Sequence, residues 1–226
     1  MTHIPDHRLF RIAGVLYLAI ILLGLGAELA LRAPVLSGQS QDPLAIRIQE
    51  GATVLRLSLV ADMLMAICDV ALAVVLFAIL APYGRLLAGM AMAFRLVQTA
   101  IIGANMLGLF GLLALSQADA AGDGGSLGAL LEVHGMGYDT GLAFFGVNCL
   151  LTGVLLLRHP AFAQWLGALV MLAGLVYLTG TTLRLMSPAA AAAFAPAYLL
   201  PIVAETTFCL WLLAGGRRQG RSHAVT

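Results

Sequence analysis

The sequence predicts an all-α protein, a polytopic membrane helix bundle with about six transmembrane helices, and its composition indicates this class. Hydrophobic residues make up 61% of the 226 positions and charged residues only 10%, whereas a soluble domain carries about 25% charged residues. The mean hydropathy is +0.98. Several apolar runs reach the roughly 20 residues that a membrane helix needs. A formal net charge of +1 provides no basic surface for a nucleic acid.

Six spans follow one another in a single transmembrane domain that we expect to cover residues 1–226. The expected spans cover about residues 9–31, 54–80, 86–115, 127–157, 162–185 and 197–214. Pro82 follows the second span, and Arg158 and Pro160 follow the fourth. Pro201 falls in the first turns of the sixth span, where a helix tolerates proline best.

The first span is expected to stay in the protein and not to be cleaved as a signal peptide. Its apolar core follows Arg8 and Arg11 and is longer than the roughly 7–15 residues of a signal-peptide core. The connection over residues 34–53 contains few apolar residues. We expect it to form a short interfacial helix or a cap over one end of the bundle.

The distribution of arginine predicts that both termini face the cytoplasm, because positive charge is in excess on the inner side of membrane proteins. The inner set would be Arg8, Arg11, Arg85, Arg158, Arg217, Arg218 and Arg221, and the outer set Arg32, Arg47 and Arg184. The loop 116–126, expected outside, contains Asp119 and Asp123 and no arginine. We therefore expect a multi-pass protein of the inner (plasma) membrane.

Polar side chains inside the spans are the main candidates for function, because charges within a bilayer are kept when they pair or line a wet cavity. Counting residues from the inner end of each span places them in two layers. The inner layer contains Asp69, Arg95, Asn148 and Glu205, and the outer layer contains Glu28, Asp62, Asn105 and Asp139, with Arg32, Arg56, His134 and Arg184 just above it. The residues expected to line a polar cavity are Asp62, Asp69, Arg95, Gln98, Asn105, His134, Tyr138, Asp139 and Glu205.

Asp69 and Arg95 are expected to meet, since a short connection makes the second and third spans antiparallel neighbours. They could form a structural ion pair between these spans, as intramembrane charges usually pair. Alternatively, Arg95 could keep the Asp69 carboxylate ionised at the floor of a cavity. Glu205 could relay protons or form a neutral hydrogen bond between helices.

The densest local motif is the segment 134–141 in the fourth span, which reads HGMGYDTG. His134 and Tyr138 are four residues apart and share a helix face. Together with Asp139 they could perform acid–base chemistry, so His134 and Asp139 are the catalytic candidates; the alternative is a hydrogen-bonded packing histidine. Gly137 and Gly141 form a GxxxG pair that permits close helix approach. Three glycines in eight residues also weaken a helix, so a local distortion is expected here.

No metal site or cofactor is predicted. Zinc normally needs three or four protein ligands, and His134 is the only histidine within an expected span. The three cysteines, Cys68, Cys149 and Cys209, are dispersed in apolar runs and give no metal-binding spacing.

Several motifs resemble those of a bacterial multi-pass integral membrane family that is catalogued only as a domain of unknown function. The motifs are Arg11-Ile-Ala-Gly14, Ala61-Asp62 with Asp69, Phe94-Arg-Leu-Val-Gln98, and His134-Gly-x-Gly-Tyr-Asp-x-Gly-Leu142 with Phe144-Phe-Gly146. The resemblance covers about residues 8–215. It implies a bacterial membrane protein and carries no activity over to this chain.

Three functions are compatible with these features. The chain could bind or transport a small molecule in a polar cavity, because transport sites lie near the midplane at broken helices. It could be an intramembrane enzyme that acts on a lipid or isoprenoid. It could also be a structural or accessory subunit whose polar residues join helices. The expected partners are the lipid bilayer and a small-molecule or lipid ligand, with no nucleic acid.

Overall fold

The computed structural model describes residues 7–37, 42–118 and 125–216, and these ranges are almost entirely helical. The helices are α1 (His7–Leu25), continued by a π-helix (Gly26–Arg32) and α2 (Ala33–Leu36), then α3 (Leu44–Glu50), α4 (Ala52–Leu80), α5 (Arg85–Ala118), α6 (Gly125–Arg158), α7 (Gln164–Met186), α8 (Pro188–Phe194) and α9 (Leu199–Leu213). Within these ranges, six segments are long and apolar enough to cross a membrane. The chain is therefore an all-α, multi-pass membrane protein, as predicted.

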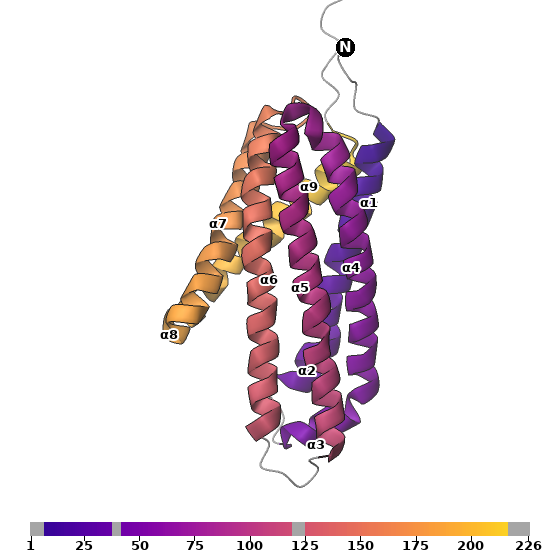
Figure 1. The fold of residues 1–226 in the computed structure, drawn as a ribbon, viewed down its shortest axis with the longest axis vertical. Helices are drawn as coiled ribbons and strands as arrows, with labels where there is room; N and C mark the ends of the chain where they lie inside the picture. Colours follow the sequence, from indigo (N-terminus) through magenta and orange to yellow (C-terminus); the bar gives the residue numbers. More distant parts are fainter. Residues whose placement is uncertain (1–6, 38–41, 119–124, 217–226) are drawn as a thin grey trace, which may run out of the picture.

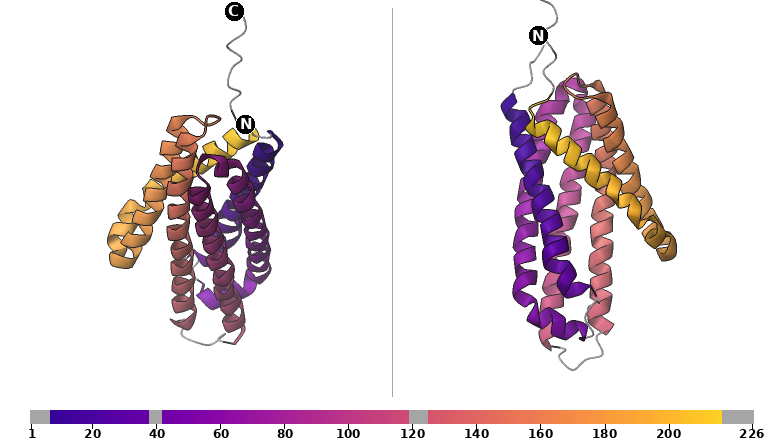
Figure 2. Two further views of the ribbon diagram at one scale, coloured as in Figure 1. Left: turned by 45° about the horizontal axis from the view of Figure 1, so that its top comes forward. Right: turned by 180° about the vertical axis from the view of Figure 1, so that it is seen from behind.

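Helices α1, α4, α5 and α6 run along the long axis of the molecule, whereas α7 and α9 are inclined to it (Figure 1). Helix α7 leans outward from α6 to α8, and α9 returns across the back of the bundle towards the start of α1 (Figure 2). His7 Nδ1 lies 2.9 Å from the Gly215 carbonyl oxygen. We call this end of the bundle the terminal end. The opposite end, which α3 covers, is the α3 end.

The connection after the first span forms one of the two expected structures, since α3 packs as a cap against α4 and α5. The first span is longer than expected and stays helical to Leu36. The sixth segment begins earlier than expected, at Pro188, because the short helix α8 and a 3-10 turn (Ala195–Tyr198) precede α9.

The prediction of a local distortion in the fourth span is wrong, because α6 is one continuous α-helix from Gly125 to Arg158. Its glycines instead allow α5 to approach. A Cβ atom at Gly137 would lie 2.8 Å from Asn105 Cγ, and one at Gly141 would lie 3.0 Å from Ile102 Cδ1. A π-helix occurs instead in the first segment, over Gly26–Arg32.

The placement of both termini in the cytoplasm stays a prediction. Arg8, Arg11, Arg85 and Arg158 belong to helices that begin or end at the terminal end. Arg217, Arg218, Arg221, Asp119 and Asp123, which also supported the orientation, lie outside the described residues.

A belt of exposed apolar side chains marks the part of the bundle that suits a bilayer. On α5, apolar side chains that are more than half exposed run from Leu86 to Phe110, a distance of about 36 Å at 1.5 Å per residue. On α4, Leu57 is also more than half exposed and lies ~35 Å along the helix from Leu80. The exposed Arg56 precedes Leu57 in the chain and lies one residue nearer the α3 end. The belt is slightly taller than the ~30 Å hydrocarbon layer of a bilayer.

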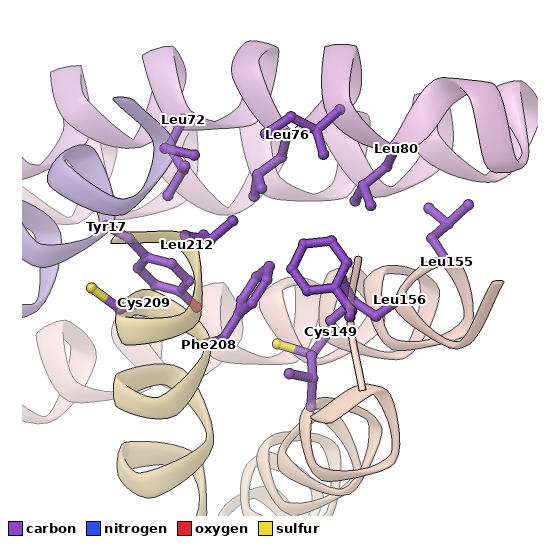
Figure 3. Close-up of a cluster of buried hydrophobic side chains, with 14 of the residues drawn as sticks. Tyr17, Leu72, Leu76, Leu80, Cys149, Leu155, Leu156, Phe208, Cys209 and Leu212 are labelled. Carbon is purple, nitrogen blue, oxygen red and sulfur yellow. The ribbon is translucent and has the colours of Figure 1, made fainter. Parts of the chain in front are cut away.

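Two apolar cores fill the bundle. The larger one lies within the belt near the terminal end and joins α1, α4, α6, α7 and α9 (Figure 3). Its members include Tyr17, Leu72, Leu76, Leu80, Cys149, Leu155, Leu156, Phe208, Cys209 and Leu212. The smaller core lies at the α3 end and contains Ala45, Ile48, Leu55, Leu59, Leu109, Leu112, Leu113 and Leu127. Polar side chains gather at two levels, one beside the larger core and one between the two cores.

Helices α6 and α7 approach so closely that two pairs of glycines face each other. A Cβ atom at Gly153 would lie 2.6 Å from the Gly167 carbonyl oxygen. A Cβ atom at Gly174 would lie 2.6 Å from the Gly146 carbonyl oxygen. The glycines are seven residues apart on each helix, so both pairs lie along one seam. Small residues allow such backbone contact between membrane helices, and we call these four residues the glycine seam.

The connection between α6 and α7 is anchored by a buried histidine. His159 is 2% exposed, and its Nδ1 accepts a hydrogen bond of 3.1 Å from the Ala161 amide. Its ring centroid lies 4.0 Å from that of Tyr83 and 4.9 Å from that of Phe162. Burial among these rings lowers the pKa of His159 to about 4, so the imidazole is neutral in the folded protein at pH 7.

We expect the folded protein to lose stability as the pH falls from about 6.5 to about 4. In this window the unfolded chain protonates His159 near its ordinary pKa of about 6.5, while the buried ring stays neutral. The unfolded state then binds more protons, which favours unfolding by an amount on the order of 2 kcal/mol. The contribution of His159 is measured by comparing the unfolding free energies of wild type and His159→Phe in detergent at pH 7.5 and at pH 4.5. The wild type should lose more stability than the variant, and equal losses would contradict the assignment.

Candidate functional site

A network of charged and hydroxyl groups crosses the middle of the bundle. The Arg95 guanidinium donates to Asp69 Oδ1 from Nε at 2.8 Å and from Nη2 at 2.5 Å. The Thr99 hydroxyl donates to the other Asp69 oxygen. The two charged residues are 4% and 2% exposed. The expected meeting of Asp69 and Arg95 is therefore confirmed, and both carboxylate oxygens of Asp69 have donors.

Aromatic residues surround this ion pair and connect it to Glu205. The Arg95 Cζ atom lies 5.3 Å from the ring centroid of Tyr17 and 5.2 Å from that of Phe145. Tyr17 donates to Glu205 Oε2 at 3.3 Å, and Tyr177 donates to Oε1. Glu205 thus joins α9 to α1 and α7. We call Asp69, Arg95, Thr99, Tyr17, Tyr177 and Glu205 the mid-bundle network.

The mid-bundle network leaves no room for a ligand beside Arg95. The cavity there has a volume of about 10 Å³ and is lined by residues that include Arg95, Asn148 and Thr152. A cavity needs about 10–15 Å³ to hold one water molecule. Asn148 donates to the Ala91 carbonyl oxygen at 2.7 Å, so its amide also serves packing between α6 and α5. These contacts favour the structural interpretation of the Asp69–Arg95 pair.

A second group of polar residues lies at the edge of the apolar belt near the α3 end. Asp62 is ~27 Å along α4 from Leu80, and Asn105 is ~30 Å along α5 from Arg85, at 1.5 Å per residue. His134 is ~36 Å along α6 from Arg158. These heights place the group where a ~30 Å hydrocarbon layer meets the lipid headgroups. We call Glu28, Arg32, Asp62, Asn105, His134 and Tyr138 the belt-edge cluster.

The π-helix places two charged residues of the belt-edge cluster. A π-helix is rare and occurs often at functional sites. Arg32 donates from Nε to Glu28 Oε2 at 2.9 Å and from Nη1 to Asp62 Oδ2. The side chains of Arg32 and Asp62 are 5% and 7% exposed, whereas that of Glu28 is 56% exposed. The guanidinium therefore lies behind the carboxylate that faces outward.

His134 and Asn105 hold α5 and α6 together through a reciprocal pair of hydrogen bonds. The Asn105 amide donates to the His134 carbonyl oxygen at 2.9 Å, and His134 Nδ1 lies 3.1 Å from the Asn105 carbonyl oxygen. A carbonyl oxygen accepts hydrogen bonds only, so Nδ1 carries the proton. In the neutral imidazole, Nε2 is then the nitrogen that can accept a proton.

Tyr138 shares the helix face of His134 and completes the cluster. It is exposed, at 39%, and the charged groups within electrostatic range of its hydroxyl are Glu28, Arg32, Glu205 and Asp62. Glu28 of the π-helix and Tyr138 of α6 are the exposed members of the cluster. Helix α9 crosses the bundle obliquely nearer the terminal end (Figure 2) and leaves this level of α1 and α6 uncovered.

Asp139 has a different set of neighbours from His134. Arg184 Nε of α7 lies 2.8 Å from Asp139 Oδ2, although its N–H does not point at that oxygen. The Thr181 hydroxyl donates to the Asp139 carbonyl oxygen at 2.9 Å. Asp139 therefore packs towards α7, whereas His134 packs towards α5. A catalytic role for either residue stays a prediction.

Other expected residues are not joined to a cluster. The side-chain oxygen of Gln98 is buried and has no hydrogen-bond partner in the described part of the chain. A cavity of about 270 Å³ lies at the α3 end beside Gln49, Leu113 and Ser116, away from the residues expected to line one. No group of three or more potential metal ligands occurs among the described residues.

The sequence did not single out several participants of these clusters. Tyr17, Tyr177 and Thr99 look like ordinary members of apolar helices, and only the fold brings them to Glu205 and Asp69. The sequence places Glu28 and Arg32 near the height of Asp62, where the structure also has them, but does not mark either as a candidate site residue. Their spacing of four residues, with the glutamate first, is typical of an ion pair on one helix and could have indicated them.

Comparisons with known proteins identify a family and assign no activity. The model of a family described as "Domain of unknown function (DUF4386)" matches residues 12–216. An uncharacterised protein of Archaeoglobus fulgidus is 26% identical over 161 residues, which cover 71% of this chain and 85% of that protein. No solved structure matches the chain. Because this relative is archaeal, a bacterial origin of the chain stays a prediction.

Proposed function

We propose that this membrane protein, which belongs to the DUF4386 family, binds an amphipathic small molecule of the bilayer at the belt-edge cluster. The family itself has no assigned activity. The polar head of the molecule would contact Glu28, His134 and Tyr138, and its apolar tail would lie along the exposed apolar side chains of α1, which include Leu18, Leu22 and Leu25. We place the protein in the plasma membrane of a prokaryote, with the α3 end outside.

The position of the cluster carries this proposal. Charged side chains within a membrane are costly, and an ionisable residue there is by default a candidate for function. Here Glu28 and Tyr138 are exposed at the height where hydrocarbon meets headgroups. A lipid-like molecule could reach them by lateral diffusion, without passing through the bundle. Its head and tail would then each meet surface of matching polarity.

Packing in the mid-bundle network argues against transport through the centre. A path along the bundle axis would have to pass Asp69 and Arg95, which are almost fully buried beside a cavity of about 10 Å³. We therefore favour binding over transport, and we assign the mid-bundle network a structural role.

An enzyme that acts on a lipid or isoprenoid is the second candidate, and one observation favours it. His134 keeps its proton on Nδ1, next to the Asn105 carbonyl oxygen, so Nε2 could act as a general base. In this candidate function His134 would work with the carboxylate of Asp62 or Glu28, which lie within electrostatic range. Asp139 is turned towards Arg184 and would not be its partner.

Native mass spectrometry of protein extracted gently from its own membrane tests the proposal. We expect wild type to retain one amphiphile per chain, and Tyr138→Ala to lower the occupancy about tenfold, which corresponds to ~1.4 kcal/mol of binding free energy. Phe110→Ala is the matched control, because Phe110 is an exposed aromatic residue of α5 at the same edge of the belt. It should leave the occupancy unchanged. A wild-type protein without any bound amphiphile, or equal losses in both variants, would contradict the proposal.

A further inference from the structure

The charge that the belt-edge cluster presents to the bilayer restricts what it can bind. Two carboxylates, Glu28 and Asp62, share the single guanidinium of Arg32, and His134 is neutral when Nδ1 alone is protonated. One negative charge is therefore left over. Asp62 is almost fully buried and contacts Arg32 directly, so the excess is presented by the exposed carboxylate of Glu28.

An anionic head would be poorly accommodated. Arg32 is 4% exposed, and its Nε and Nη1 atoms already donate to carboxylates. A phosphate or carboxylate arriving from the bilayer would meet Glu28 before it met the guanidinium, and like charges repel. The exposed Arg56 lies about 120° around α4 from Asp62, at 3.6 residues per turn, and Arg184 pairs with Asp139.

Tyr138 offers a second group suited to a cation. It is exposed and lies ~30 Å along α6 from Arg158, at about the height of Glu28, which is ~30 Å along the first segment from His7. The face of a tyrosine ring attracts ammonium groups, and aromatic residues commonly line sites for quaternary ammonium ligands. A carboxylate and an aromatic face together neutralise and contact an alkylammonium group. Both act more strongly at a partly desolvated position than in water.

We infer that the belt-edge cluster selects an amphiphile with a cationic head, an alkylamine or a quaternary ammonium, which Glu28 and Tyr138 contact while Arg32 holds the Glu28 carboxylate in place. This inference rests on the proposed function and names the ligand class of the same site. The geometry assigns each residue a separate task. Glu28 supplies the charge, Tyr138 supplies the ring, and the Arg32–Asp62 pair anchors the π-helix to α4.

Three probes with the same alkyl chain and fluorophore test this inference on the full chain in dodecyl maltoside micelles. Their heads are trimethylammonium, phosphate and glucoside. We expect the trimethylammonium probe to bind wild type roughly tenfold more tightly than the glucoside probe, equivalent to one unit in the logarithm of Kd, and the phosphate probe to bind most weakly. Glu28→Gln should abolish the preference for trimethylammonium. Glu132→Gln should preserve it, because Glu132 is an exposed carboxylate of α6 outside the cluster.

The outcomes separate the inference from the proposed function. Saturable binding without preference, or with preference for the phosphate probe, would overturn the cationic assignment and leave the binding site in place. Absence of saturable binding of all three probes to wild type would overturn the proposed function itself. The comparison of probes on wild type decides the charge class even if Glu28→Gln fails to fold. A preference that survives Glu28→Gln in a folded protein would also overturn the inference.

Discussion

Arg95→Ala is expected to destabilise the folded protein by about 3–5 kcal/mol, because it leaves the Asp69 carboxylate buried without its counter-charge. Asp69 is 4% exposed, and Arg95 supplies two of the three donors seen at its oxygens. Asp69→Ala should have a similar effect, since the guanidinium would then lie buried between the rings of Tyr17 and Phe145. Chemical unfolding in detergent, followed by circular dichroism, measures both losses.

A paired apolar replacement distinguishes a structural pair from a functional one. Asp69→Leu combined with Arg95→Met removes both charges while keeping similar side-chain volume, and such exchanges are often neutral or stabilising. The double variant should recover most of the stability that each single variant loses, and a double-mutant cycle measures this coupling. It should also still bind the amphiphile, because the belt-edge cluster is untouched. Single variants as stable as wild type, or a folded double variant that has lost binding, would contradict the structural role.

Gly153→Leu is the second change from which we expect a large effect. The new side chain would point at the Gly167 carbonyl oxygen, which lies 2.6 Å from the position of a Cβ atom at Gly153. Backbone atoms cannot move aside as a flexible side chain can, so α6 and α7 would have to separate along the glycine seam. Overpacking costs about 1–3 kcal/mol and sometimes more, and we expect the upper end of that range. The thermal unfolding midpoint in detergent measures it.

Gly103→Ala is the matched control for the seam. Gly103 also lies within a long helix, α5, but a Cβ atom there would meet nothing within 4 Å. Alanine lowers the entropy of the unfolded chain and favours a helix by up to ~1 kcal/mol, so this variant should be as stable as wild type or slightly more stable. If the Gly153→Leu variant were as stable as the Gly103→Ala variant, this result would contradict the close approach of α6 and α7 at the glycine seam.

The helical architecture could be predicted because a membrane imposes a minimum length on every span. Runs of about 20 apolar residues were sufficient to find the six segments. The contact between Asp69 and Arg95 could be predicted by counting residues from the short turn around Pro82 that joins the antiparallel helices α4 and α5. Positions close to such a turn accumulate little error in height.

The details of the candidate site could not be predicted because they depend on tilt and on rotation about the helix axis. Helices α7 and α9 are inclined to the others (Figure 1), and this inclination brings Tyr177 and Glu205 together. Residues His134 and Asp139 are five apart on α6, about 140° around the helix at 3.6 residues per turn, so they face different neighbours. The glycines of α6 serve close packing with α5 and α7, since a helix surrounded by others is stabilised mostly by its contacts and less by its intrinsic propensity.

The contacts of α6 and of the π-helix determine which side of the belt-edge cluster can open locally. Hydrogen bonds between His134 and Asn105 fasten α6 to α5, and the glycine seam fastens it to α7. On the opposite wall, the π-helical stretch rests chiefly on α4 and is secured there by Arg32 and Asp62. Segments with few partners open at the lowest free energy. Exchange between the bilayer and the cluster should therefore proceed by local opening of the π-helical stretch Gly26–Arg32, while α1 itself stays packed in the larger core.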